Sequence, residues 1–151
     1  MDNASTTKVD PEVLNTMLPY FTEYYGNPSS IHAFGREARK AVDIARANIA
    51  DLIGAKENEI IFTAGGTESD NLAIKGISYL NKDKRTTKGP HIITSVIEHP
   101  GVLETCRHLE TQGFQVKYLP VDTDGIVNLM DLQKSISKNT FLITTMFANN
   151  E

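Results

Sequence analysis

The stretch that decides the fold is Glu-Ile-Ile-Phe-Thr-Ala-Gly-Gly-Thr-Glu-Ser-Asp-Asn, residues 59–71. Its apolar, β-branched run at 60–62 predicts a short buried strand. The pair Gly65–Gly66 allows a tight turn with little side-chain bulk. Thr67 then stands where a helix N-cap is expected, and Asp70 follows as an acidic near-match to a capping box. The stretch therefore predicts a strand, a glycine turn and a helix.

The residues after Thr67 continue this pattern, because Ala73, Ile77 and Leu80 recur at helical spacing on one apolar stripe. A strand, turn and helix in this order aim free backbone N–H groups and a hydroxyl at one spot, which the helix dipole makes partly positive. Such a spot favours an anion, most simply a phosphate. By itself, a short Gly-rich loop is also typical of an ordinary strand-to-helix turn. The motif lacks the Gly-Lys-Ser/Thr of a nucleotide P-loop and the G-x-G-x-x-G dinucleotide fingerprint.

The composition indicates an ordinary globular chain. Its 151 residues suit one domain, and a net charge of −4 gives no support to nucleic-acid or membrane-surface binding. No apolar run approaches the ~18 residues of a membrane helix, and no signal peptide opens the chain. A single cysteine excludes an internal disulfide framework and suits a reducing cytoplasm, where we expect the protein to be located.

Strand patterns alternate with helix patterns along the whole chain. The expected strands are 60–62, 91–97, 115–119 and 141–147. The expected helices are 34–53, 129–136 and three that begin near Asp10, Thr67 and Pro100. This alternation predicts an α/β fold with three layers, α/β/α, around a mainly parallel sheet.

The long helix at 34–53 has the clearest boundaries. Gly54 is expected to end it as a left-handed C′ residue, and its arginines at 36, 39 and 46 are expected on the solvent face. Cys106, on the helix after Pro100, falls on an apolar face, so we expect it to pack in the core.

Two loops carry polar groups. Residues 20–32 are rich in aromatic and turn residues and could contribute to a site, although His32 alone is more typical of a surface or capping residue. The basic run Lys82–Lys88 is typical of a solvated loop.

Three polar residues each follow an expected strand: Thr67, His99 and Asn150. The carboxyl ends of parallel strands meet at one edge of a sheet, and ligands of open α/β sheets bind at that edge. We therefore expect these three residues to converge.

Five motifs in order along the chain carry a family resemblance: Asp2–Thr7, Tyr25–His32, Phe62–Asn71, Glu98–Pro100 and Asn149–Glu151. With these motifs the chain resembles the N-terminal part of a cysteine desulfurase, in the aminotransferase class V group of fold-type-I pyridoxal-phosphate (PLP) enzymes. The resemblance implies an N-terminal arm and short helix at 1–20. It implies that 21–151 form the N-terminal half of a large PLP-binding domain.

The resemblance also implies residue roles. Thr67 and the backbone of Gly66 and Thr67 should hold the PLP phosphate. His99 should stack on the pyridine ring and shuttle a proton. Asn150 should hydrogen-bond the 3′-oxygen of PLP and the carboxylate region of the substrate. Asn27 and His32 lie in a matching loop and receive no firm role.

The family's Schiff-base lysine lies in a later Ser-x-His-Lys motif, which does not occur in these residues. The aspartate that pairs with the pyridine nitrogen and the cysteine that receives sulfur also lie later, and Cys106 is not at that position. We therefore expect a truncated chain that is inactive alone, because cofactor attachment needs an aimed lysine and sulfur transfer needs a reachable thiolate.

The activity implied for the complete enzyme is removal of sulfur from L-cysteine, giving L-alanine and an enzyme persulfide for iron–sulfur cluster or thio-cofactor assembly. The resemblance also implies a homodimer and a sulfur-acceptor protein such as an iron–sulfur scaffold. A selenocysteine lyase or another class V enzyme stays open, as does a non-catalytic fragment that binds phosphate or dimerises. A nucleotide-dependent oxidoreductase is disfavoured by the absent fingerprint.

Overall fold

A computed structural model describes residues 3, 5–82 and 89–150. Most of the expected basic loop, together with Asp2, Ala4 and Glu151 of the motifs, lies outside these residues. The chain divides into two compact units, Met1–Phe62 and Thr63–Glu151. The expected division after residue 20 stays a prediction.

The first unit is helical. Its elements are α1 (Pro11–Met17), α2 (Pro19–Thr22), α3 (Ala33–Ile53) and the 3₁₀ turn η1 (Glu57–Glu59). As predicted, α1 begins with a cap at Asp10, whose Oδ1 accepts the N–H of Glu12 at 2.8 Å. Helix α3 ends at Gly54 with φ of 69°, which also confirms the prediction.

The loop that precedes α3 folds back tightly onto the start of that helix. A Cβ atom at Gly26 would lie 2.2 Å from the carbonyl oxygen of Phe34, and one at Gly35 would lie 2.2 Å from that of Ser30. Any side chain at either position would clash with backbone. His32 caps the helix, because its Nδ1 accepts the N–H of Gly35 at 3.2 Å.

Two expectations for this unit are wrong. Residues 60–62 do not form a strand, and Ile61 and Phe62 are 68% and 47% exposed. A strand needs a hydrogen-bonded neighbour, and none of the described strands pairs with these residues. Arg46 is half-buried instead of fully solvated, since its guanidinium donates to the carbonyl of Ile60 and lies 4.8 Å from the ring centroid of Phe62.

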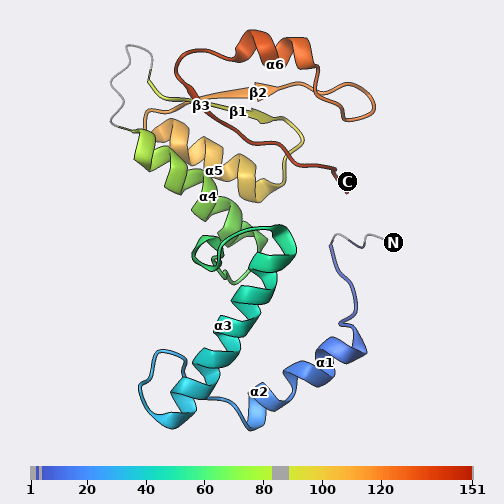
Figure 1. Cartoon of the computed structure of the whole chain (residues 1–151). Coiled ribbons are helices and arrows are strands. Elements are labelled where there is room, and N and C mark those ends of the chain that lie inside the picture. Colours follow the sequence, from blue (N-terminus) through green and yellow to red (C-terminus); the bar gives the residue numbers. More distant parts are fainter. Residues whose placement is uncertain (1–2, 4, 83–88, 151) are drawn as a thin grey trace. The chain divides into compact units, whose positions relative to one another are not determined.

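The second unit is an α/β layer structure (Figure 1). Its elements are α4 (Gly66–Asn81), β1 (His91–Ser95), α5 (Pro100–Thr111), β2 (Gln115–Leu119), α6 (Leu129–Ser135) and β3 (Thr140–Ile143). The three strands are parallel in the order β2-β1-β3. Helices α4 and α5 lie on one side of the sheet and α6 on the other, so the predicted α/β/α architecture is confirmed.

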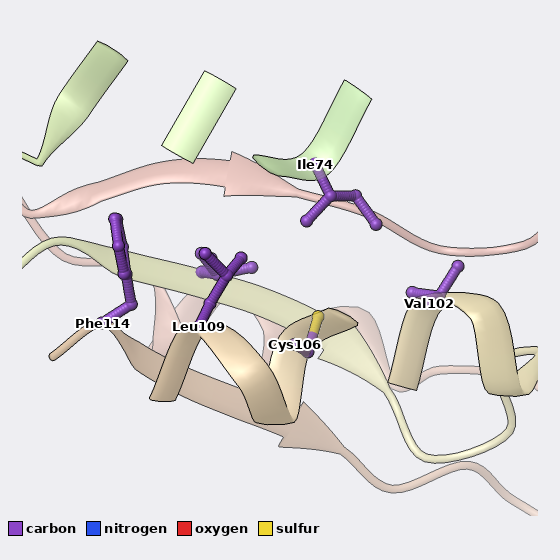
Figure 2. Packing of buried hydrophobic residues seen from close by; sticks show 6 residues of the cluster. Ile74, Val102, Cys106, Leu109 and Phe114 are labelled. Carbon is purple, nitrogen blue, oxygen red and sulfur yellow. The ribbon is translucent and has the colours of Figure 1, made fainter. Parts of the chain in front are cut away.

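The core of this unit lies between the sheet and helices α4 and α5 (Figure 2). Its fully or nearly fully buried members are Ile74, Ile92, Val102, Cys106, Leu109 and Phe114. Cys106 is 0% exposed, as the apolar face predicted.

Two strands are shorter than expected. β1 ends at Ser95 instead of residue 97, and β3 ends at Ile143 instead of residue 147. Near both strand ends, hydrogen bonds go to one carboxylate. Glu98 accepts them from the Ser95 hydroxyl and from the Met146 N–H. Among the described residues, no helix is both long and apolar enough to cross a membrane.

Candidate functional site

The start of α4 differs from the prediction. The helix begins at Gly66 with Gly65 as its N-cap, so Thr67 is a helical residue and not the cap. Asp70 forms no capping box with it. Instead, Oε2 of Glu68 accepts the N–H of Ala64 at 2.6 Å and closes the turn.

Side chains on both sides of the turn explain the earlier start. The hydroxyls of Thr63 and Ser69 each donate to the carbonyl of Gly65 at 3.2 Å. They also lie 2.6 Å from each other. These contacts hold the turn at Gly65, so the helix does not need a cap from Thr67.

A hollow of about 470 Å³ lies over this helix start. It is lined by Ala64, Gly65, Gly66, Thr67, Glu68 and Asn71. A Cβ atom at Gly65 or Gly66 would meet nothing within 4 Å, so both glycines face open space. The first N–H groups of a helix have no helical acceptor. This end of α4 can therefore receive an anion. The carboxylate that lines the hollow, Glu68, already accepts the N–H of Ala64.

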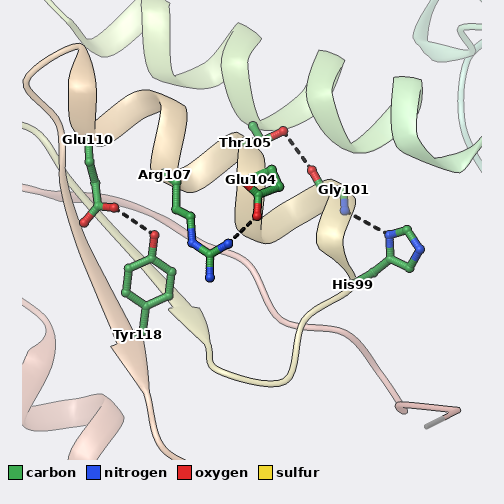
Figure 3. A network of polar contacts seen from close by, with 7 residues as sticks. All are labelled: His99, Gly101, Glu104, Thr105, Arg107, Glu110 and Tyr118. Carbon is green, nitrogen blue, oxygen red and sulfur yellow. Dashed lines mark hydrogen bonds and ion pairs between the residues drawn. The ribbon is translucent and has the colours of Figure 1, made fainter.

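Helix α5 follows β1 after the turn at 96–99, and Figure 3 shows its first residues. Its N-cap is His99, whose Nδ1 accepts the N–H of Gly101 at 3.0 Å. The carbonyl of Gly101 accepts the hydroxyl of Thr105 at 2.8 Å. Because Nδ1 is the acceptor, the neutral imidazole carries its proton on Nε2. His99 is exposed, so Nε2 can donate to a ligand.

The starts of α4 and α5 lie against each other. A Cβ atom at Gly101 would lie 3.1 Å from Nδ1 of His99 and 3.5 Å from both Oγ1 and Cγ2 of Thr67. The two helices also pack along their lengths. Only the small residue Gly101 therefore separates two of the expected site residues.

Asn150 lies in the irregular segment that follows β3. Its neighbour Asn149 donates from Nδ2 to the carbonyl of Ile97 at 2.9 Å, shortly before His99 in the chain. The structure thus places Thr67 and His99 on either side of Gly101 and attaches the segment of Asn150 to the turn that precedes His99. The roles of these residues toward a cofactor stay predictions.

One residue of the site received no role from the sequence. Glu98 is only 5% exposed, and its carboxylate accepts the Ser95 hydroxyl at 2.6 Å and the Met146 N–H at 2.9 and 3.0 Å. The Glu98–Pro100 motif pointed to this place, but the contact with Met146 spans 48 residues and leaves no local pattern.

Cys106 is not a nucleophile in this structure. Burial, and then the negative charges of Glu110 and Glu98, raise the pKa of its thiol from 9.0 to about 11. The thiolate is the reactive form of cysteine. The side chain therefore acts in packing.

Asn27 and His32 make contacts within their own loop. Oδ1 of Asn27 accepts the N–H of Ser29 at 2.9 Å, and His32 caps α3. Within the described part of the chain, no group of three or more His, Cys, Asp or Glu residues could hold a metal ion.

Known proteins resemble the chain over its whole length. The aminotransferase class-V family model matches residues 1–151. The cysteine desulfurase IscS of Methanosarcina thermophila is 57% identical over 100% of the chain, and a cysteine desulfurase of Nostoc sp. is 51% identical over the same span. The chain covers 36% of the length of each of these relatives.

Solved structures agree in fold. A NifS-like protein superimposes with a TM-score of 0.92 at 43% identity, covering 99% of this chain and 40% of that protein. A structure described as SspA in complex with cysteine gives a TM-score of 0.89 at 42% identity, covering 99% of this chain and 42% of that one. With the family model matched from end to end, the chain belongs to the aminotransferase class-V family.

Proposed function

We propose that these residues form the cofactor-binding part of a PLP-dependent cysteine desulfurase. The observation that carries the proposal is the meeting of Thr67 and His99 on either side of Gly101. An anion-receiving helix start and an exposed imidazole lie together at one edge of a parallel sheet, where ligands of such sheets bind. The names of the relatives supply the reaction class.

The start of α4 fits the phosphate of PLP. The hollow is open, Gly65 and Gly66 contribute no side-chain bulk, and the positive end of the helix dipole favours an anion. We assign the phosphate to the Gly66 and Thr67 N–H groups and to the Thr67 hydroxyl. These groups bind and orient the cofactor.

His99 and Asn150 are assigned to the rest of the cofactor. The imidazole of His99, fixed through Nδ1, presents a flat face to stack on a ring and a proton on Nε2 to hold or transfer. Asn150 is assigned to the 3′-oxygen of PLP and the substrate carboxylate region. When bound, PLP supplies an electron sink for the carbanion of an amino acid.

The whole reaction proposed is transfer of the sulfur atom of L-cysteine to an enzyme thiol, leaving L-alanine and an enzyme persulfide. Cys106 is buried and has a raised pKa, so the receiving thiol is assigned to residues beyond these 151. The linking lysine is assigned there as well, because the Ser-x-His-Lys motif does not occur in these residues. We further propose a cytoplasmic homodimer that passes sulfur to an acceptor protein for iron–sulfur cluster or thio-cofactor assembly.

A second candidate is a non-catalytic module that binds a phosphate ligand. The hollow over α4 and the inert thiol favour it for the 151 residues taken alone. The two candidates differ in whether added residues create turnover.

The test compares this chain with a chimera in which it replaces the matching part of the Methanosarcina thermophila relative. Both are incubated with PLP, L-cysteine and a thiol reductant, which releases the persulfide sulfur as sulfide, and alanine and sulfide are measured. We expect turnover in the chimera and none in the chain alone. A folded chimera that binds PLP but produces no alanine would leave only the phosphate-binding role. Turnover by the chain alone would contradict the assignment of lysine and thiol to other residues.

A further inference from the structure

Glu98 is a buried carboxylate with neutral partners. It is 5% exposed, and neither ion pair recorded among the described residues involves it. Burying a charged group is costly unless hydrogen bonds compensate. Here the Ser95 hydroxyl binds Oε1, and the Met146 N–H lies within reach of both carboxylate oxygens.

The position of Glu98 in the chain connects two parts of the proposed site. The next residue is His99, which begins α5. Met146, its partner across the sheet, lies in the irregular segment that leads from β3 to Asn150. Glu98 therefore joins the turn that carries one proposed cofactor contact to the segment that carries the other.

Three hydrogen bonds attach that segment to β1 and the following turn. They are Thr144 N–H to the Ile93 carbonyl at 2.9 Å, Met146 N–H to the Glu98 carboxylate, and Asn149 Nδ2 to the Ile97 carbonyl at 2.9 Å. The first continues the pairing of β3 with β1, and the third lies beside Asn150. Met146 lies between these two contacts, after the end of β3, where no strand among the described residues accepts its N–H. The Glu98 carboxylate accepts that hydrogen bond instead.

We infer that Glu98 is a positioning residue, which fixes the segment of Asn150 relative to His99. The inference rests on the proposed function, because the position of Asn150 relative to His99 matters only if both residues contact the same cofactor. Glu98 touches neither substrate nor cofactor in this scheme. It acts through the Met146 N–H, so an acceptor oxygen at this place matters more than its charge.

The experiment uses the chimera described above with three substitutions. Glu98→Ala removes the acceptor, Glu98→Gln keeps an acceptor oxygen for the Met146 N–H, and Glu104→Ala is the control. Glu104 lies on the exposed surface of α5 and pairs with Arg107, so its loss removes an equal charge away from the segment. Hydrogen exchange of the Met146 amide, the PLP dissociation constant and the absorption spectrum of bound PLP are measured.

We expect Glu98→Ala to speed exchange at Met146 and to weaken PLP binding, each by about tenfold, as for loss of a hydrogen bond to a charged group. The spectrum of bound PLP should shift, exchange in β1 should stay slow, and Glu98→Gln should restore native values. Unchanged exchange at Met146 would overturn the contact. Faster exchange with native PLP affinity and spectrum would overturn the positioning role and leave a purely structural one.

If Glu98→Ala does not fold, Glu98→Gln carries the test. Native exchange and PLP affinity in that variant support the inference, and loss of both in a folded protein overturns it. Failure of the proposed function is separately visible, because the unmodified chimera would then bind no PLP or produce no alanine.

Discussion

The backbone N–H of Gly101 donates a hydrogen bond to Nδ1 of His99 across 3.0 Å. This contact caps α5 and fixes the imidazole, and it places the Gly101 Cα beside the side chain of Thr67. Gly101 therefore stabilises the start of the helix and also allows His99 and Thr67, two proposed cofactor contacts, to lie close to each other. The two effects can be separated by substitution.

Gly101→Ala should disturb the site more than it changes the stability of the helix. The new Cβ would lie 3.1 Å from Nδ1 of His99 and 3.5 Å from Thr67, so the imidazole must move. Alanine itself favours a helix over glycine by about 1 kcal/mol. In the chimera we expect weaker PLP binding, with a melting temperature that changes little because the displaced imidazole also loosens the cap of α5 and offsets the gain from alanine.

Gly76→Ala is the matched control for that substitution. Gly76 lies inside α4, and a Cβ there would meet nothing within 4 Å. It should raise stability by about 0.5–1 kcal/mol and leave PLP binding unchanged. Equal PLP affinity in the Gly101 and Gly76 variants would contradict the proposed geometry.

Thr67→Ala should weaken retention of PLP. A hydrogen bond to a charged group contributes roughly 1.5–3 kcal/mol, which corresponds to a rise in the dissociation constant of about 10- to 150-fold. Fluorescence titration of the cofactor-free chimera measures it. Thr111→Ala is the control, because that hydroxyl lies at the far end of α5 and binds the His108 carbonyl. An unchanged constant in Thr67→Ala would remove this residue from the phosphate site.

Local signals in the sequence located several boundaries correctly. Asp10 followed by a proline predicted the start of α1, and Gly54 predicted the end of α3. Each of these depends on contacts within a few residues. The start of α4 was missed by two residues, because Thr63, Glu68 and Ser69 compete with Thr67 for the turn.

Contacts between distant segments were not predictable in this way. The apolar run at 60–62 has the composition of a strand, but strand formation depends on a neighbour elsewhere in the chain. The bond from Met146 to Glu98 likewise shortens β3 from a position 48 residues away. The position of His99 after β1 followed from the alternation of strands and helices, whereas Thr67 was expected after a strand at 60–62 that the structure does not contain.

Substitutions of His99 should separate its chemical role from its capping role. His99→Ala removes both and should slow turnover of the chimera by about 10²–10⁴-fold, with loss of the cap costing about 1 kcal/mol. His99→Asn keeps a side-chain acceptor for the start of α5 but has no imidazole. We expect native thermal stability and strongly reduced turnover for the asparagine variant. Near-native turnover with lowered stability in His99→Ala would indicate a capping role alone.

The buried thiol of Cys106 should make stability fall at high pH. Its pKa is about 11 in the folded chain against 9.0 ordinarily, chiefly because burial disfavours the thiolate. Between these values the unfolded chain loses the proton and the folded chain keeps it, so ionisation favours unfolding as pH rises. The contribution is fully present below pH 9 and is lost as pH rises toward 11. Denaturant unfolding of the chimera at pH 8 to 11 measures it, compared with Cys106→Ala. The alanine variant should start less stable, because it leaves a small cavity in the core, but this part of the pH slope should be absent from it.

Native Cys106 should also resist thiol reagents at pH 8 until denaturant is added. Rapid labelling of the folded protein at this residue would show that the thiol is accessible and would make Cys106 a candidate for the sulfur-receiving group. Identical slopes in both proteins would contradict the raised pKa.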